Sequence, residues 1–242
     1  MTGRAFQVET LGAADGPGIR TVFFLSGCPL RCAYCHNPES WDPSGGEPLE
    51  PEAALRIALR ARPYYGARGG VTLSGGEPLM QPEFGAELFA LLKSEGIHTA
   101  LDTSGVGGGS ARRLLDATDL CLLDVKSTDP GAFSRIAGGG SLSEAEAFLR
   151  ELSARGIETW IRQVVAVGMN DSDGDADALR ALAAGHACVT RIELLPFRKL
   201  CAEKYARLGI PFPMAGAAEP SEARLRALRA RLGSCADGSP SR

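Results

Sequence analysis

The feature that most restricts the fold of this 242-residue chain is a regular alternation between short apolar runs and longer segments of helical periodicity. Six runs have the composition of strands buried on both faces. They are predicted at residues 20–25, 70–73, 98–102, 120–125, 159–167 and 191–197. Helices are predicted at residues 51–61, 82–95, 143–156, 175–184 and 221–232, most of them meeting a glycine at the end.

A strand–helix unit repeated about six times predicts an α/β fold with parallel strands and right-handed crossovers. Six units are fewer than the eight of a closed barrel, so the count fits an open or partial barrel. A doubly wound sheet fits the periodicity almost as well. No internal linker is visible, so we expect one domain over residues 1–242, with a frayed tail at 233–242.

Composition narrows the function classes. Hydrophobic residues make up 44% of the chain, and the net charge is −3 with a pI near 5.7. Neither value favours binding to nucleic acid. There is no run of 18 apolar residues and no apolar signal core near Met1, so we expect a cytoplasmic protein without a membrane segment.

Three of the seven cysteines lie within eight positions. Cys28, Cys32 and Cys35 follow the first predicted strand in the loop 26–41, with the spacing C-x3-C-x2-C. Thiolates bind iron–sulfur clusters or zinc. A closed zinc site or a ferredoxin-type cluster requires four ligands, whereas a catalytic site keeps one position open.

Explanations other than a catalytic metal site exist for all seven cysteines. The trio could be a zinc site completed by Cys201 or Cys121, while His36 adjoins Cys35 and would strain a tetrahedron. The four scattered residues are predicted to be buried small side chains or unpaired surface thiols. These are Cys121, Cys188, Cys201 and Cys235.

Polar residues also stand where later strands end, which is where the chemistry of parallel α/β folds is found. Glu77 follows the Gly75-Gly76 pair in "LSGGEP", and Asp102 and Thr103 lie in "ALDTSG". A plain strand-to-helix turn, an Asx turn or an N-cap would explain these residues equally well.

Charged residues at the last strands need partners. Asp124 and Lys126 lie two apart at a strand end, so they share a face and form either an ion pair or a ligand clamp. Arg162 stands inside an apolar strand and requires an anionic partner, either Asp124 or the carboxylate of a ligand. Arg198, Lys199 and Lys204 follow the last strand, where solvated surface charge is the simpler explanation for the two lysines.

Taken together, these residues resemble the radical S-adenosylmethionine (SAM) enzymes. The most specific motif is "DGPGIRTVFFLSGCPLRCAYCHNPESW", and "VTLSGGEPLMQPEF", "GIHTALDTSG", "DLCLLDVK", "WIRQVV" and "IELLPF" follow in order. The Cys-His-Asn-Pro extension with Trp41 resembles, more narrowly, the activating enzymes of glycyl radical enzymes such as pyruvate formate-lyase. The similarity runs from Asp15 to about Gly209.

The resemblance implies a partial (β/α)6 TIM-like barrel. Cys28, Cys32 and Cys35 would bind three irons of one [4Fe–4S] cluster, and the open iron would take the amino and carboxylate groups of SAM. One electron would cleave the sulfonium bond, giving methionine and a 5′-deoxyadenosyl radical that abstracts a hydrogen atom from a glycine Cα of the partner. No cysteine occurs between His36 and Leu120, so no second cluster is expected.

The resemblance also implies roles for individual residues. Those implied to contact SAM are Tyr34 near adenine, Asn37, Gly75, Gly76, Glu77, Asp102, Lys126, Arg162 and Arg198. A monovalent-cation site (Na⁺ or K⁺) is implied at Asp102, Thr103, Asp124 and the carbonyl of Leu122. Asp15 is implied to lie near the glycine loop of the partner.

Two residues depart from the family pattern: Arg198 stands where histidine is usual, and Cys201 where glycine is usual. The partner is expected to be pyruvate formate-lyase or a relative, with a flavodoxin or ferredoxin as electron donor and a monomeric activase. The alternatives are activation of a different glycyl radical enzyme, a radical SAM enzyme acting on a small molecule, for example in deazapurine synthesis, or a non-enzymatic electron carrier or zinc protein.

Overall fold

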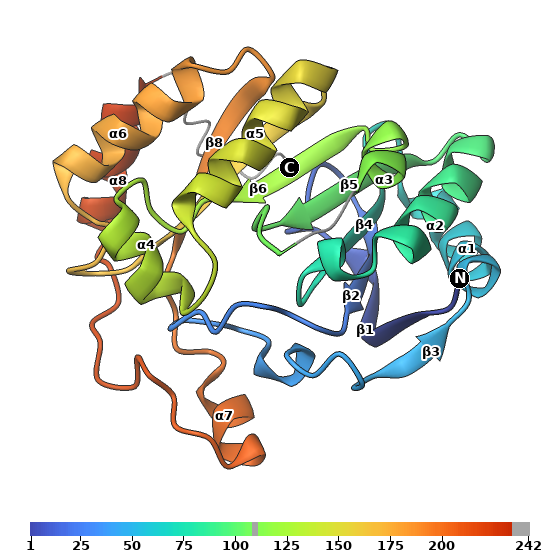
Figure 1. Cartoon of the computed structure of the whole chain (residues 1–242), viewed down its shortest axis with the longest axis horizontal. Helices are drawn as coiled ribbons and strands as arrows, with labels where there is room; N and C mark the ends of the chain where they lie inside the picture. Colours follow the sequence, from blue (N-terminus) through green and yellow to red (C-terminus); the bar gives the residue numbers. More distant parts are fainter. Residues whose placement is uncertain (108–110, 234–242) are drawn as a thin grey trace. The chain divides into compact units, whose positions relative to one another are not determined.

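The computed structural model describes residues 1–107 and 111–233. Its strands hydrogen-bond in the order β3-β1-β2-β4-β5-β6-β7-β8 (Figure 1). The order has two ends, β3 and β8, so the described strands form an open sheet, and the predicted α/β class with a partial rather than a closed barrel is confirmed. Residues 234–242 of the predicted frayed tail, including Cys235, lie outside the described residues.

The chain divides into two compact units, which are described separately. The first comprises residues 1–29 and 39–122, and the second comprises residues 30–38 and the described residues from 123 onward. Strand β6 (Leu120–Asp124) contributes residues to both. The expectation of a single domain stays a prediction.

The first unit contains a sheet and the helices that follow its strands. The strands are β1 (Gly3–Gly12), β2 (Arg20–Leu25), β3 (Glu47–Leu49), β4 (Gly70–Gly75) and β5 (His98–Thr103). The helices are α1 (Pro51–Ala61), α2 (Pro82–Ser94) and α3 (Arg112–Asp116), with short 3₁₀ turns at Arg62–Tyr64 and Pro78–Met80.

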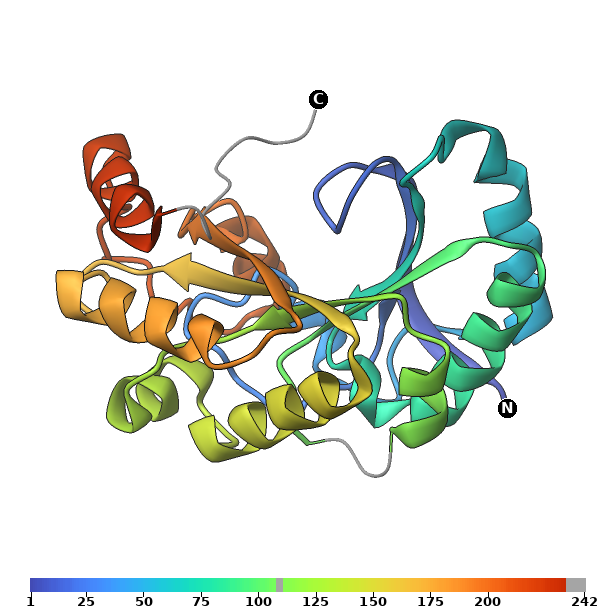
Figure 2. The ribbon, with the colours of Figure 1, turned by 90° about the horizontal axis from the view of Figure 1, so that it is seen from above.

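Strands β2, β4 and β5 are parallel and almost continuously buried, as expected of strands covered on both faces. Helix α2 packs against α1, α3 and β5, and Figure 2 shows these helices along one side of the strands. Gly85 allows the close approach of α2, because a Cβ there would lie 3.0 Å from Leu114 and 3.1 Å from Leu73.

Two strands of this unit were not predicted. Strand β1 pairs antiparallel with both β2 and β3. Five consecutive residues of β1, 7–11, are exposed, so the segment lacks the apolar run by which the other strands are recognised. The three residues of β3 are too few to show any periodicity.

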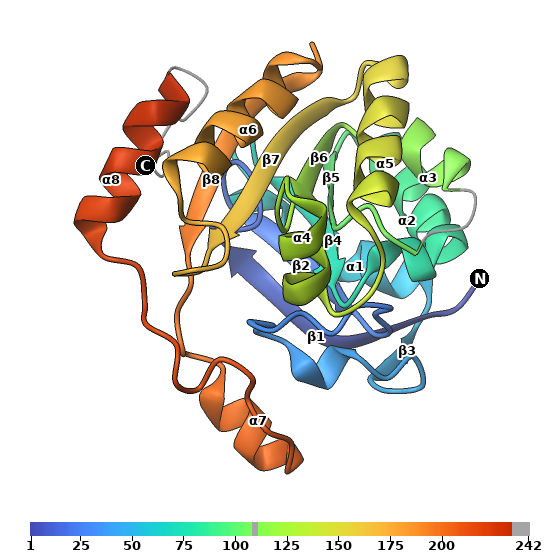
Figure 3. The ribbon, with the colours of Figure 1, turned by 60° about the vertical axis from the view of Figure 1, so that its left-hand side comes forward.

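The second unit contains strands β7 (Glu158–Val165) and β8 (Val189–Pro196), which are parallel. Its helices are α4 (Pro130–Ala137), α5 (Leu142–Arg155), α6 (Asp173–Ala184), α7 (Ala202–Leu208) and α8 (Glu222–Leu232). The 3₁₀ turn Pro38–Ser40 begins at the last residue of this unit's N-terminal segment. Helix α8 lies along α6 and contacts β8, burying Leu225, Leu228 and Leu232 (Figure 3).

Hydroxyl caps set the starts of three helices in this unit. Ser141 caps α5 and accepts from the amide of Glu144, so α5 starts at Leu142, one residue before the predicted start at Ser143. Ser172 and Asp175 form a capping box, so α6 starts two residues before the prediction. Ser221, the first residue of the helix predicted at 221–232, caps α8 by accepting from the amide of Arg224.

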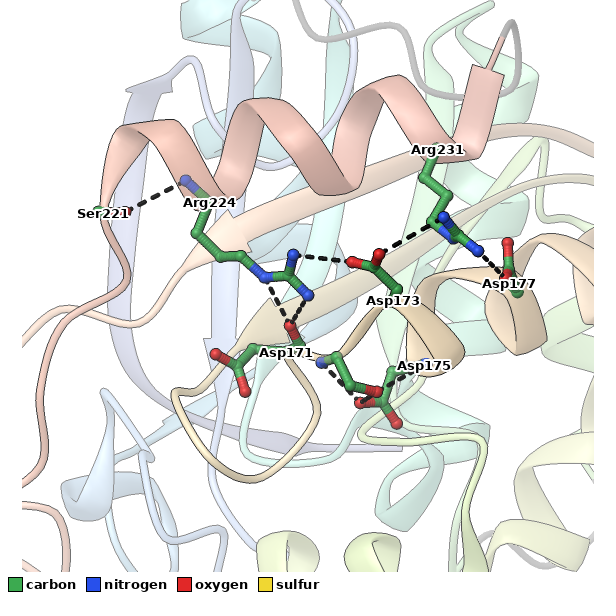
Figure 4. A network of polar contacts seen from close by, with 8 residues as sticks. Asp171, Asp173, Asp175, Asp177, Ser221, Arg224 and Arg231 are labelled. Carbon is green, nitrogen blue, oxygen red and sulfur yellow. Dashed lines mark hydrogen bonds and ion pairs between the residues drawn. The ribbon is translucent and has the colours of Figure 1, made fainter.

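A charged network joins α8 to the start of α6 (Figure 4). Arg224 donates to the carbonyl oxygen of Asp171 and to the carboxylate of Asp173. Arg231 reaches Asp173 and Asp177. The buried leucines of α8 are therefore accompanied by partly exposed ion pairs between α8 and α6.

No helix of the described residues is both long and apolar enough to cross a membrane.

Candidate functional site

In the first unit, Glu77 is a buried carboxylate that follows the end of β4. It is 1% exposed and accepts hydrogen bonds from the Leu79 amide, the Thr103 hydroxyl, and the amide and hydroxyl of Ser104. Burial raises the pKa of Glu77, and these hydrogen bonds oppose the rise. The turn after β4 is thereby joined to the turn after β5.

The backbone around Glu77 is equally restrained. The amide of Gly76 donates to the carbonyl of Leu25 and the amide of Glu77 to that of Gly27, both at 2.8 Å. Gly75 has φ of +107°, and a Cβ on Gly76 would lie 2.2 Å from the Gly27 oxygen. Both glycines are therefore required by the close approach of this turn to the end of β2.

Asp102 lies at the end of β5, where Oδ2 accepts from the Ser74 hydroxyl at 2.8 Å. Thr103 is 3% exposed, and its hydroxyl donates to Glu77 and accepts from the amide of Gly105. The strand-end placement predicted for both residues is confirmed. Ser74 and Ser104, which hold these side chains, were missed because serines at a turn are common.

Asp15 lies between β1 and β2, at the opposite end of β2 from Ser26–Pro29. The buried Arg20 holds this loop through the carbonyl of Pro17, and Thr72 donates to the carbonyl of Asp15. Thr72 pairs with Val22, so the carbonyl of Asp15 lies beside the middle of the β2–β4 pair rather than beyond its end.

The second unit brings Cys32 and Cys35 together. The amide of Cys35 donates to the carbonyl of Cys32 at 3.0 Å, which closes a turn. The loop is fixed on α4, because the amides of Arg31 and Ala33 donate to the carbonyls of Ala137 and Ile136. Cys28 belongs to the first unit, so the binding of one cluster by all three cysteines stays a prediction.

Lys126 lies close to Cys32. Its ammonium pairs with Asp124 and stands 5.6 Å from the centroid of the Tyr34 ring. Burial would lower the pKa of Lys126, but Asp124, Cys32 and Tyr34 raise it, so the side chain is a buried cation at neutral pH. The predicted contact between Asp124 and Lys126 is present.

Burial governs the two neighbours of this cation. Burial raises the pKa of Cys32 to about 11 against the opposing effect of Lys126, and burial also raises the pKa of Tyr34. A metal that takes the Cys32 thiolate therefore displaces a proton. The hydroxyl of Tyr34 and Oδ1 of Asp124 are buried and have no hydrogen-bond partner among the described residues.

Residues 35–37 are held by the segment that follows β8. Tyr205 donates to the carbonyl of Cys35, and Lys204 donates to Oδ1 of Asn37 at 2.9 Å. His36 donates from Nε2 to the carbonyl of Arg198. Lys204 was expected to be a solvated surface charge, but it forms this hydrogen bond to Asn37. Lys199 donates to the carbonyl of Ala215 at an exposed position.

Arg162 finds an anionic partner on the neighbouring strand. Its Nε donates to Glu193 at 2.8 Å, in register across β7 and β8, and Arg191 reaches the other oxygen of Glu193 at 3.2 Å. Glu193 was missed, although it lies on the same face of its strand as Arg191. Arg191 in turn stacks on Trp160 at 4.5 Å from the ring centroid.

The departures from the family pattern are accommodated locally. Arg198 pairs with Glu219 and Glu222 through its guanidinium. Cys201 is 2% exposed with φ −83° and ψ −4°, a conformation open to any residue. Cys121 and Cys188 are buried as predicted.

No group of three His, Cys, Asp or Glu side chains that could hold one metal ion occurs among the residues that the structure describes. Asp102, Thr103 and Leu122 lie in the first unit and Asp124 in the second. The monovalent-cation site stays a prediction.

Comparison with known proteins adds three findings. The family model of the radical SAM superfamily matches residues 22–180. The chain is 42% identical to the pyruvate formate-lyase-activating enzyme of Clostridium pasteurianum over 88% of this chain and 90% of that protein. It is 35% identical to the pyruvate formate-lyase 1-activating enzyme of Escherichia coli K12 over 96% of each.

A solved structure is similar in fold. The crystal structure of a domain of pyruvate-formate lyase-activating enzyme from Bacteroides vulgatus covers 71% of this chain with 99% of its own, at a TM-score of 0.58. The two sequences are 23% identical, so this likeness supports the fold alone.

Proposed function

Because the chain belongs to the radical SAM superfamily, we propose that it activates a glycyl radical enzyme, pyruvate formate-lyase or a relative of it. The observation that carries this proposal is the sequence similarity to two activating enzymes, which covers nearly the full length of this chain and of each relative. A shared fold alone would leave the substrate open.

The family implies one [4Fe–4S] cluster and SAM, and the donor chemistry of this chain fits both. Cys28, Cys32 and Cys35 would hold three irons, since thiolates are the usual ligands of such clusters. Two buried polar atoms, the Tyr34 hydroxyl and Asp124 Oδ1, have no partner among the described residues, and a bound group would satisfy them.

When bound, the reduced cluster would supply one electron for cleavage of the sulfonium bond of SAM, and SAM would supply the 5′-deoxyadenosyl group that takes a hydrogen atom from glycine. The residues of the chain would bind and orient both cofactors. The buried ammonium of Lys126 would offset the negative charge of the Cys32 thiolate, and it stands beside Tyr34, near which adenine would pack. Arg162, with Glu193 at its Nε, would face the carboxylate or ribose of SAM.

Several finer assignments belong to the same proposal. Gly75, Gly76 and Glu77 would form the strip that faces the methionine amino group, and Asn37 and Arg198 would border the cofactor. A monovalent cation would bind between Asp102, Thr103, Asp124 and the carbonyl of Leu122.

The partner protein and the setting complete the proposal. Asp15 would contact the glycine-bearing loop of the partner. A flavodoxin or ferredoxin would supply the electron to a monomeric activase in the cytoplasm.

The test mixes anaerobically reconstituted chain, SAM, a reductant and purified pyruvate formate-lyase, and looks for a glycyl radical by electron paramagnetic resonance. The proposal predicts a radical on the partner, 5′-deoxyadenosine in solution, and about four iron atoms per chain. Cys32→Ala should lose both products. Formation of 5′-deoxyadenosine without a radical on any glycyl radical enzyme tested would instead favour a small-molecule substrate.

A further inference from the structure

The carboxylate of Glu77 is fully used inside the protein. Oε1 accepts from the Leu79 amide at 3.1 Å and from the Thr103 hydroxyl at 2.5 Å. Oε2 accepts from the amide and the hydroxyl of Ser104 at 2.9 and 2.6 Å. A carboxylate offers about four lone-pair sites, so four donors leave it no capacity for a further cation or ammonium group.

Burial leads to the same result. Glu77 is 1% exposed, so a ligand could reach its carboxylate only after the surrounding turns had opened. Opening would leave the amides of Leu79 and Ser104 unpaired, which is costly for buried groups. The side chain is therefore unsuited to the role of contacting the methionine amino group.

The backbone of the same residue points to a different role. The amide of Glu77 donates to Gly27 at the start of the cysteine loop, while its side chain holds Thr103 and Ser104. One residue thus joins the chain ends that leave β2, β4 and β5. We propose that Glu77 is a positioning residue: its carboxylate ties the turn after β4 to the turn after β5, and its amide ties the same turn to the end of β2. The backbone of residues 75–77, rather than the Glu77 side chain, is thereby presented to the cofactor.

Two substitutions test the hydrogen bonds between the Glu77 carboxylate and the turn after β5, one on each side of the contact. In Glu77→Gln, either orientation of the amide turns its NH₂ group toward a backbone amide, because each carboxylate oxygen accepts from one. Ser104→Ala leaves the Glu77 carboxylate in place and removes one of its donors. Tyr65→Phe is the matched control, because Tyr65 is a buried hydroxyl of the same unit that bonds Thr21 and Ala58.

The first measurement uses the chain without metal or cofactor. Hydrogen exchange of the Gly76 and Glu77 amides should become about tenfold faster or more in Ser104→Ala, as expected for the loss of a hydrogen bond to a buried charge. Tyr65→Phe should leave those amides unchanged. Unchanged exchange in Ser104→Ala would overturn the proposal, whatever the enzyme activates.

The second measurement is the Kd for SAM of the reconstituted protein, and only this arm rests on the proposed function. Both Ser104→Ala and Glu77→Gln should weaken binding, by about tenfold for the serine variant, and the double variant should be no weaker than Glu77→Gln. If Glu77 instead contacts the ammonium group directly, Glu77→Gln alone will lose affinity, and the proposal is wrong. If the wild-type chain binds no SAM, the proposed function fails. The hydrogen-exchange result still decides whether the Glu77 carboxylate positions the turn after β4.

Discussion

Replacing Lys126 by methionine removes the ammonium that pairs with the partly buried carboxylate of Asp124, and this makes the effect on stability predictable. The Lys126 side chain is 9% exposed and that of Asp124 is 25% exposed. Asp124 Oδ1 already has no hydrogen-bond partner among the described residues. In Lys126→Met the carboxylate would keep its charge and lose its ion pair.

The magnitude follows from the burial of the pair. Breaking a buried ion pair from one side costs about 3–5 kcal/mol. Since a quarter of the Asp124 side chain is exposed, the lower end applies, about 3 kcal/mol. For a chain of this size each kcal/mol lowers Tm by roughly 2–4 °C, so a fall of about 6–12 °C is expected.

The double variant Lys126→Met/Asp124→Asn separates charge from packing. It removes both charges, so it should recover most of the loss and leave a deficit of about 1 kcal/mol. Lys93→Met is the matched control, because the Lys93–Asp119 pair is 45% and 28% exposed and should contribute about 1 kcal/mol or less. Urea unfolding of the cluster-free chain at pH 7 gives all four values.

Two results would refute this reasoning: a Lys126→Met chain as stable as the wild type, or a double variant no more stable than the single one. The same proteins, once reconstituted, also test the role of Lys126 toward SAM. If its ammonium faces the cofactor, the double variant will regain stability and still bind SAM weakly.

Three further outcomes follow from the structure. Gly76→Ala should abolish SAM binding and shift the unfolding midpoint, because its Cβ would lie 2.2 Å from the Gly27 oxygen, and normal binding would contradict the close approach. Arg20→Met should lower the free energy of unfolding by about 3 kcal/mol or more, because several acceptors inside the protein lose a charged donor. A loss below about 1 kcal/mol in urea titration would show that water replaces the guanidinium at these acceptors. Arg231 lowers the pKa of Asp177, so the stabilisation from their contact is complete above the ordinary Asp pKa and is lost as pH falls through the lowered value. Between these two pKa values, Tm should fall less with decreasing pH in Asp177→Asn than in the wild type. Equal slopes of Tm against pH in the two proteins would refute the linkage.

The fold could be predicted where burial alone determines the pattern. Strands β2, β4 and β6 are apolar runs because both of their faces are covered, and all six predicted strands are present. Strand β1 escaped because the exposed residues 7–11 give it no apolar run. Its pairing with β2 depends on a partner distant from any local signal.

The site could be predicted in its residue types and only partly in its contacts. Strand ends place Glu77, Asp102 and Asp124 correctly, since polar residues after a buried strand need a partner or a ligand. Which partner each one takes depends on tertiary register. Glu193 opposes Arg162 only because β7 and β8 align that way, and Ser104 reaches Glu77 only through the turn after β5.

The arginine at position 198 shows how this scaffold can absorb a change next to its cysteine loop. The loop is held there by the carbonyl oxygen of Arg198, which accepts a hydrogen bond from His36. Every residue type supplies a backbone carbonyl, so this bond does not depend on the side chain at position 198. The guanidinium is directed instead to Glu219 and Glu222. An exchange of histidine for arginine therefore alters the charge beside the loop while leaving its backbone anchor intact. Any effect on function should appear in the affinity for cofactor or partner before it appears in the retention of iron.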